Sequence, residues 1–146
     1  MVEADAPAPA VWPTLRARDA RRLIRFLVEA FGFEEIVVYG DQPDGSGDTV
    51  VHAELGWPLG GGVMLASLHD APGTVPVDAP PQPGMSSCYV VTDAPDALAN
   101  RAAAAGATLV VALHDTDYGS RDFTALDPEG NRWSFGTYAG EPRRRS

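Results

Sequence analysis

The residues with the clearest capacity for chemistry are a histidine and a glutamate two positions apart, His52 and Glu54. Alternate side chains of an extended strand point to the same face, so these two side chains should lie together. Such a pair can act as a general base with its orienting partner, or supply two ligands of a metal ion. Asp122 is a further candidate base. The alternative is a solvated or salt-bridged pair with no chemistry.

Few other residues could carry reactive chemistry. His69 and His114 each precede an aspartate where a predicted strand ends, so both are expected at the surface. Cys88 is the only cysteine, which excludes an intramolecular disulfide, a CxxC redox pair and a thiolate zinc cluster. We expect its thiol to face the core and to be unreactive.

Composition excludes several classes of function. The 11 basic residues are all arginine, and a chain without lysine can form neither a Schiff base nor a P-loop. The net charge of −9 disfavours nucleic acid and favours a cationic ligand. No apolar run approaches the ~20 residues of a membrane helix. The N-terminus lacks the pattern of a signal peptide, so we expect a cytoplasmic protein without a membrane partner.

Two helices are predicted, over 19–32 and 93–106. Each begins at an aspartate that can cap the first N–H groups and ends at a glycine suited to a left-handed residue. The first has a full apolar face and the second a thinner one; their members are Leu23, Ile24, Leu27, Val28 and Phe31, and Leu98, Ala102 and Ala105.

Each helix follows one predicted strand and precedes three more. The strands are expected over 11–17, 35–39, 49–55 and 63–68, and then over 87–92, 108–113, 121–126 and 132–138. The chain is therefore expected to be one α+β domain of two βαβββ modules, about 11–70 and 85–139, with a proline-rich linker at 71–84 and a tail at 140–146. In each module a curved mixed sheet should pack its helix on one face and leave a concave face for a ligand.

With this repeat, the sequence resembles the vicinal oxygen chelate superfamily of glyoxalase I, extradiol dioxygenases, fosfomycin-modifying enzymes and bleomycin-resistance proteins. The resemblance is carried by Leu15-Arg-Ala-Arg-Asp19 with Ala30-Phe-Gly-Phe33, and by Asp127-Pro-Glu-Gly-Asn131 followed by Trp133-Ser-Phe135. It covers roughly residues 11 to 139.

The resemblance implies a four-point metal site at positions held in the metalloenzymes by His, Gln or Glu. Here those positions are Trp12, Met64, Ser87 (or Ser86, by the alternative alignment of the modules) and Ser134. None is a usual ligand for a divalent catalytic metal. The chain therefore resembles the metal-free, drug-binding branch of the family, which implies a homodimer that needs no cofactor and performs no metal-dependent reaction.

Strand alternation predicts the lining of the ligand site in the first module. Val11, Pro13 and Leu15 are expected to face the helix, which turns Trp12 and Arg16 to the concave face. Trp12 could stack on a planar ligand and donate its N–H, or plug a vacated metal pocket. Arg16 could clamp an anion, or pair with Asp122 or Glu54. Further along, Val51, Ala53 and Leu55 are expected in the core, which places His52 and Glu54 opposite them.

In the second module Ser134 should face Thr124 across a hairpin, with Asp122 two residues further. Tyr89 should share the face of Ser87, while Trp133 and Phe135 belong to the core. The polar segment 115–122 contains Tyr118 and Arg121 and could form a lid or a dimer contact.

The resulting prediction is a protein that binds a small organic molecule, planar or cationic, with antibiotic sequestration as the implied role. The alternative is a lyase or dioxygenase-like enzyme of the same superfamily that uses a relocated metal or an acid–base site.

Overall fold

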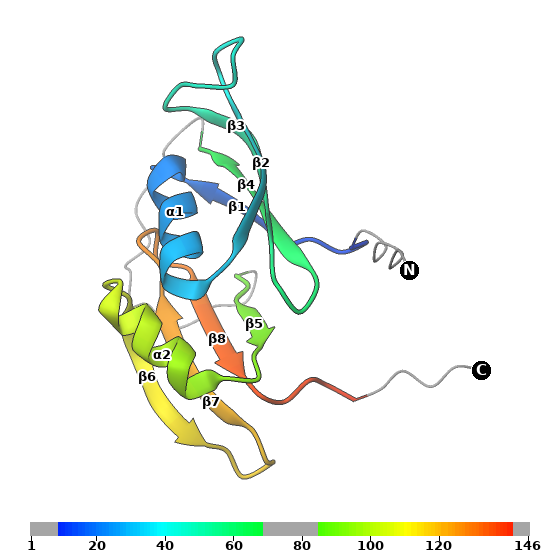
Figure 1. The fold of residues 1–146 in the computed structure, drawn as a ribbon, viewed down its shortest axis with the longest axis vertical. Helices are drawn as coiled ribbons and strands as arrows, with labels where there is room; N and C mark the ends of the chain where they lie inside the picture. The colour runs from blue at the N-terminus through cyan, green and yellow to red at the C-terminus, as the bar shows by residue number, and fades with distance from the viewer. Residues whose placement is uncertain (1–8, 69–84, 142–146) are drawn as a thin grey trace, which may run out of the picture. The chain divides into compact units, whose positions relative to one another are not determined.

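The computed structural model of the protein describes residues 9–68 and 85–141. Within these residues, eight strands and two α-helices follow one another as βαβββ–βαβββ, the α+β arrangement that the sequence predicted (Figure 1). The predicted proline-rich linker and His69 lie outside the described residues.

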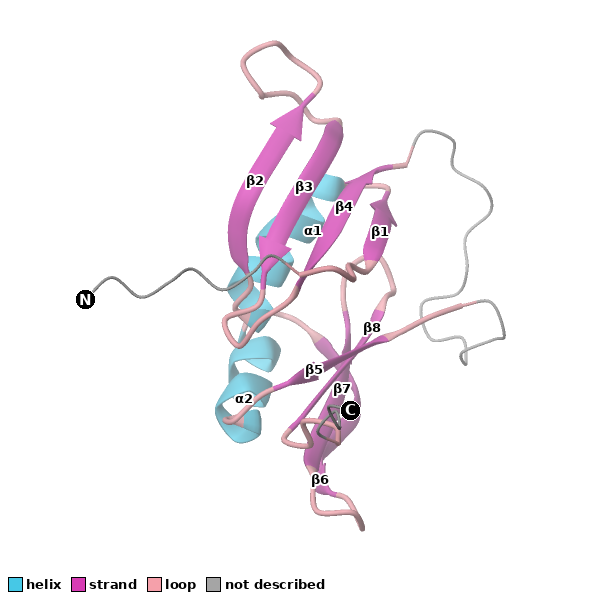
Figure 2. Cartoon of the chain, turned by 90° about the vertical axis from the view of Figure 1, so that its right-hand side faces the viewer, coloured by secondary structure: helices cyan, strands magenta, loops and turns pink. Residues whose placement is uncertain are grey.

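The first module consists of β1 (Thr14–Ala17), a helical segment, β2 (Glu34–Gly40), β3 (Val50–Gly56) and β4 (Gly62–Ser67). Its strands form one mixed sheet in the order β1-β4-β3-β2. The outer strand β1 pairs with β4 in parallel, whereas the other neighbours are antiparallel. The helical segment covers one face of this sheet (Figure 2).

The second module repeats this plan. It consists of β5 (Cys88–Val91), α2 (Pro95–Ala104), β6 (Thr108–Asp115), β7 (Arg121–Leu126) and β8 (Arg132–Gly136). The strand order is β5-β8-β7-β6, and the outer strand β5 again pairs in parallel, with β8. The helix α2 contacts β6 and β7.

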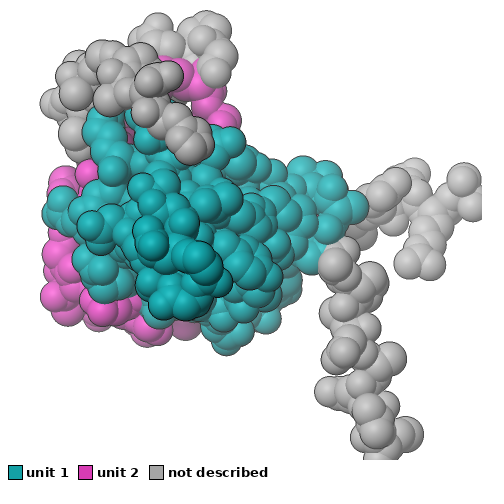
Figure 3. Space-filling model, turned by 90° about the horizontal axis from the view of Figure 1, so that it is seen from above, with its two compact units in different colours: residues 1–28, 32–71 teal, residues 29–31, 72–146 magenta. Residues whose placement is uncertain are grey.

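The chain forms two compact units that follow the modules except at one helical turn (Figure 3). Residues 1–28 and 32–71 make the first unit, while residues 29–31 and 72–146 make the second. The last turn of the first helical segment therefore belongs with the second unit. Phe31 explains this assignment, because its ring lies 4.7 Å from the ring of Phe135 and 5.8 Å from that of Trp133, both in β8.

The first helical segment begins and ends as predicted. The Asp19 carboxylate accepts from the backbone N–H of Arg22 at 3.1 Å, at the start of α1 (Ala20–Phe26). The segment then widens into a π-helical turn, η1 (Leu27–Phe31), and ends at Gly32 with φ 92°. This left-handed conformation is one that glycine adopts without a Cβ penalty.

The second helix is capped differently from the prediction. Its N-cap is Ala94 rather than Asp93, and no side chain in the described part of the chain caps the N–H groups of its first turn. Pro95 occupies the first turn, where its missing N–H costs nothing. Thr92 instead accepts from the N–H of Ala94 at 3.2 Å. Gly106 has φ 93° just after the helix, so the predicted left-handed glycine is confirmed.

The apolar positions of the helices and strands are largely as predicted. The first helical segment buries Leu23, Ile24, Leu27 and Phe31, and β8 buries Trp133 and Phe135 completely. In α2 the buried apolar residues beyond the first turn are Leu98, Ala99 and Ala102. Ala105 is exposed because the helix has already ended at its C-cap.

Three predicted core residues of the strands, Val11, Pro13 and Val51, are instead exposed. Val11 is 86% exposed because β1 begins only after Pro13, which has no N–H for a strand ladder. Val51 is 59% exposed because the β2–β3 register skips it: Tyr39 pairs with His52 and Gly40 with Val50. Such a β-bulge turns the extra residue outward. Val50 is buried in its place.

The turn between β7 and β8 is organised by a buried carboxylate. Asp127 is 3% exposed and accepts from the backbone N–H groups of Glu129 and Asn131, the Asn131 amide and the Trp133 indole. These four donors lie at 2.8–3.0 Å and satisfy both carboxylate oxygens. Burial nonetheless raises the pKa of Asp127 above its ordinary value. The carboxylate fixes the turn and the orientation of the largest core side chain.

In the part of the chain that the structure describes, no helix is long and apolar enough to cross a membrane.

The contrast between the two helix starts can be tested by a matched pair of variants. Asp19→Ala should lower the free energy of unfolding by about 1 kcal/mol, because it removes a capping hydrogen bond. Asp93→Ala should change it by less than about 0.5 kcal/mol, since Asp93 is exposed and is not the N-cap of α2. Urea denaturation followed by circular dichroism measures both. Equal losses in the two variants would contradict this assignment of the caps.

Candidate functional site

The face of the first sheet that turns away from the helix carries most of the predicted chemistry. Thr14, Met64, Glu54 and Val37 lie in register across β1, β4, β3 and β2. The adjacent row of Leu15, Leu65, Ala53 and Val38 points to the opposite side, where Leu65 and Ala53 are buried. The alternation therefore leaves the first row on what we call the helix-free face.

His52 and Glu54 share the helix-free face, as predicted. His52 Nε2 lies 2.7 Å from Glu54 Oε2, and the two side chains are 39% and 27% exposed. The Tyr39 ring stacks beside the imidazole, with centroids 6.5 Å apart and an interplanar angle of 18°. A glutamate that contacts one imidazole nitrogen can orient the ring and leave its other nitrogen for a ligand. Among the described residues, no group of three or more His, Cys, Asp and Glu side chains could hold a metal ion.

Trp12 lies next to the first sheet but differs from the prediction in one respect. Its Nε1–H donates to the Pro9 carbonyl at 3.0 Å, so this group is already used within the chain. The ring is half-buried and passes close to Gly62, where an added Cβ would lie 2.8 Å from Trp12 Cζ3. The side chain can offer a ligand its aromatic surface rather than a hydrogen bond.

Arg16 is exposed at the end of the same face. The predicted alternative of a salt bridge with Glu54 is wrong for the residues that the structure describes, since the Glu54 carboxylate instead contacts His52. The Arg16 guanidinium can therefore meet an anionic group from solution.

The helix-free face of the second sheet carries the corresponding row of Tyr89, Ser134, Thr124 and Val111. The hydroxyls of Thr124 and Ser134 hydrogen-bond across the hairpin at 2.8 Å. Their predicted pairing is therefore confirmed. Ser87 precedes β5 and is exposed. Cys88 is half-buried, and burial together with the charge of Asp127 raises the pKa of its thiol, as expected for an unreactive cysteine.

A cluster of tyrosines surrounds Asp122 at one end of this face. Tyr118 donates its hydroxyl to Asp122 Oδ2 at 3.2 Å, and Ser120 donates to Oδ1. The Ser120 oxygen in turn accepts from the Tyr138 backbone N–H at 3.0 Å. Tyr89 donates to the Tyr138 carbonyl at 2.7 Å. The rings of Tyr118 and Tyr138 meet edge to face with centroids 5.8 Å apart.

The hydroxyls of Tyr89 and Tyr118 remain protonated at neutral pH. Burial, with a smaller contribution from the Asp122 charge, raises the pKa of Tyr89 above its ordinary value of 10.0. The pKa of Tyr118 is raised by desolvation and then by the same carboxylate. Both tyrosines therefore act as neutral hydrogen-bond donors, Tyr118 to the Asp122 carboxylate and Tyr89 to the Tyr138 carbonyl.

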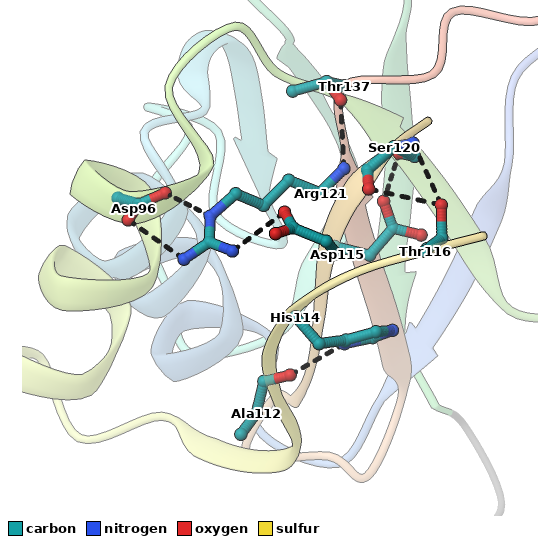
Figure 4. Close-up of polar contacts among 9 residues, drawn as sticks. Asp96, Ala112, His114, Asp115, Thr116, Ser120, Arg121 and Thr137 are labelled. Atoms are coloured by element: carbon teal, nitrogen blue, oxygen red, sulfur yellow. Dashed lines mark hydrogen bonds and ion pairs between the residues drawn. The ribbon is translucent and has the colours of Figure 1, made fainter. Parts of the chain in front are cut away.

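Arg121 does not join this cluster. Its guanidinium contacts Asp96 in the first turn of α2 at 2.8 Å and Asp115 at the end of β6 at 2.9 Å (Figure 4). These contacts raise its pKa further, so the charge is permanent. The predicted polar segment 115–122 is thus the tip of the β6–β7 hairpin, with Asp115 in β6 and Arg121 and Asp122 already in β7.

The repeated register shows which positions of the two modules correspond. Thr14 and Tyr89 lie 75 positions apart at the same place in their rows, and so do the N-caps Asp19 and Ala94. Met64 and Ser134 correspond in the same way. The counterpart of Trp12 is therefore Ser87 rather than Ser86. The four expected metal positions therefore form one pair in each module, Trp12 with Met64 in the first and Ser87 with Ser134 in the second.

Sequence reasoning missed Ser120, Tyr138 and Gly136 as parts of the cluster. An added Cβ at Gly136 would overlap Asp122 Oδ1 and lie 2.6 Å from the Tyr89 hydroxyl, so the cluster requires a glycine there. A glycine inside a strand can mark the close approach of another segment, so Gly136 in β8 could have suggested that a side chain packs closely against the strand there. Tyr138 lies beyond the end of β8, where no periodicity applies.

Solved structures with the same fold provide comparisons. TioX from Micromonospora sp. ML1 is 27% identical, with a TM-score of 0.65 over 87% of this chain and 98% of that protein. A mutant of glyoxalase I from Zea mays is 20% identical, with a TM-score of 0.66 over 87% of this chain, which spans only 44% of the length of that protein.

A third structure is the fosfomycin resistance protein FosX from Listeria monocytogenes, complexed with Mn(II) and sulfate ion. It is 13% identical, with a TM-score of 0.60 over 95% of both chains. No curated protein matches the sequence.

The family assignment rests on the sequence as well as the fold. The family model described as Glyoxalase/Bleomycin resistance protein/Dioxygenase superfamily matches residues 10–135, which run from before β1 into β8. The βαβββ repeat and the solved structures agree with this match. The chain therefore belongs to the glyoxalase/bleomycin resistance protein/dioxygenase superfamily.

Proposed function

We propose that this protein binds a small organic molecule on the helix-free faces of its sheets, without a catalytic metal. The observation that carries the proposal is the chemistry of two equivalent pairs of positions, Trp12 with Met64 and Ser87 with Ser134. An indole, a thioether and two hydroxyls are poor donors to divalent catalytic metals, which take carboxylate, imidazole or thiolate ligands.

The neighbouring side chains suit an organic ligand. The first module offers the aromatic surface of Trp12 and Tyr39 together with the donor groups of Arg16. The second module, taken by itself, offers the aromatic surface of Tyr89 and Tyr118 and the hydroxyls of Thr124 and Ser134. A binding site typically combines apolar contact area with a few polar groups that orient the ligand. Such a lining has no need of a metal to hold its ligand.

The proposed role is sequestration of an antibiotic or a similar compound by a cytoplasmic homodimer. The support is the family, whose description includes bleomycin resistance proteins, and the fold shared with a fosfomycin resistance protein. The acidic net charge of −9 favours the approach of a cationic compound.

Native mass spectrometry of the protein, purified without chelators, tests this proposal. We expect a dimer that carries an organic compound and no stoichiometric metal, because the proposed site offers aromatic and hydroxyl groups rather than metal ligands. Addition of a panel of neutral, anionic and cationic antibiotics extends the test to compounds lost on purification. Stoichiometric Zn, Ni, Mn or Fe, or failure to bind any compound of the panel, would contradict the proposal.

Trp12→Ala should weaken binding of the compound so identified by at least about tenfold, on the order of 1.4 kcal/mol, because the aromatic surface is lost. Trp12→Phe is the matched control and should retain most of the affinity. Isothermal titration calorimetry measures both variants. Unchanged affinity in Trp12→Ala would leave the indole only the role of filling space beside Gly62.

A second candidate function is favoured by the 2.7 Å contact between His52 and Glu54. A histidine held by a glutamate on an open sheet face can remove a proton from a bound substrate, as a lyase requires. A relocated metal at this pair, as in a dioxygenase-like enzyme, would need a third ligand from outside the described residues or from the substrate. Asp122 is the other candidate base.

His52→Gln distinguishes the two functions. If the protein is an enzyme of this kind, the variant should lose about a hundredfold or more of the turnover of the bound compound, measured by liquid chromatography and mass spectrometry, while its affinity stays nearly unchanged. His114→Gln is the control, since His114 is exposed on β6. Absence of turnover in the unaltered protein would reject the enzyme and leave the binding function.

A further inference from the structure

Two carboxylates, Asp122 in β7 and Glu141 beyond the end of β8, lie beside aromatic rings. Asp122 is half-buried and accepts from the hydroxyls of Tyr118 and Ser120. Glu141 accepts from the Tyr138 hydroxyl at 3.2 Å. No arginine or histidine in the described parts of the chain forms an ion pair with either carboxylate. The nearest arginine in sequence to Asp122, Arg121, is occupied by other aspartates.

Three tyrosine rings around these carboxylates remain open to solvent. Tyr89, Tyr118 and Tyr138 are 45%, 60% and 40% exposed. The edge-to-face arrangement of Tyr118 and Tyr138 presents ring surfaces in two directions. The face of an aromatic ring attracts a cation, and a neighbouring carboxylate adds to that attraction.

The cluster is held in place before any ligand binds. Tyr89 is fixed by its bond to the Tyr138 carbonyl, and Ser120 ties the Tyr138 backbone to Asp122. Gly136 permits the close approach of Tyr89 and Asp122, since any Cβ there would overlap both. A preorganised site loses little conformational freedom when it is occupied.

We infer that Tyr89, Tyr118, Tyr138, Asp122 and Glu141 form a binding site for an organic ammonium group. A methylated or primary ammonium would lie against the tyrosine rings and offset the charge of Asp122, whose carboxylate oxygens retain free lone pairs. The inference rests on the proposed binding function, because it names the chemical class of the ligand at one of the faces described above.

The test compares choline with dimethylbutanol, in which carbon replaces the quaternary nitrogen. Both are titrated into the full-length protein and followed by ligand-observed NMR. Choline should bind at least about tenfold more tightly, because only the charged compound gains from the carboxylates and the ring faces. Its affinity should fall as salt is raised, whereas that of dimethylbutanol should not. These two measurements use the unaltered protein, so they do not depend on whether a variant folds.

Variants then locate the site. Asp122→Asn should weaken choline binding by about fivefold or more, and Tyr118→Leu by a similar factor, while Tyr118→Phe keeps the ring and most of the affinity. Asp117→Asn removes the same charge from an exposed position of the same hairpin and should change the affinity by less than about twofold. Circular dichroism confirms that each variant is folded.

The outcomes separate this inference from the proposed function. Equal affinity for choline and dimethylbutanol, or equal losses in Asp122→Asn and Asp117→Asn, would overturn the ammonium site. If native mass spectrometry then finds a neutral or anionic compound, the binding function stands and only the ammonium site is rejected. If no organic compound of any charge binds, both proposals are rejected.

Discussion

One constraint organises both modules. A helix covers only one face of each sheet, so every second residue of the central strands is buried against the helix and must be apolar. In the first module this constraint selects Leu15, Leu65 and Ala53 for the helix side. The residues between them, Thr14, Met64 and Glu54, are then free of the core and can be polar or functional. The candidate functional residues therefore lie on the sheet face where packing against the helix does not require an apolar side chain.

The duplication places different chemistry at equivalent positions. The central row of the first module holds Met64 beside Glu54, while the corresponding row of the second holds Ser134 beside Thr124. His52 in β3 corresponds to Asp122 in β7, and each of these titratable groups lies beside a tyrosine on its face. The helix-facing residues maintain the scaffold in both modules, so the residues of the other rows can differ between them.

Polar side chains that stabilise the scaffold are distinct from those available to a ligand. Asp127 is buried and accepts from four donors, and the charge of Arg121 is paired with two aspartates, so both groups already serve the scaffold. Asp122 has two hydroxyl donors and no cationic partner among the described residues. The number and charge of existing partners therefore separate structural carboxylates from candidate ligand groups more clearly than residue type does.

The sequence by itself determined the βαβββ repeat, most of the helix-facing residues, the shared face of His52 and Glu54, and the facing pair Thr124 and Ser134. These features follow from local periodicity, from capping glycines and from short hairpin turns, all of which are readable within a few residues. The tertiary structure decided the bulge that exposes Val51, the cap at Ala94, the bond that occupies the Trp12 indole, and the tyrosine cluster at Asp122. Each of these depends on register or on contacts between segments, which periodicity does not specify because residues distant in sequence compete for the same partners.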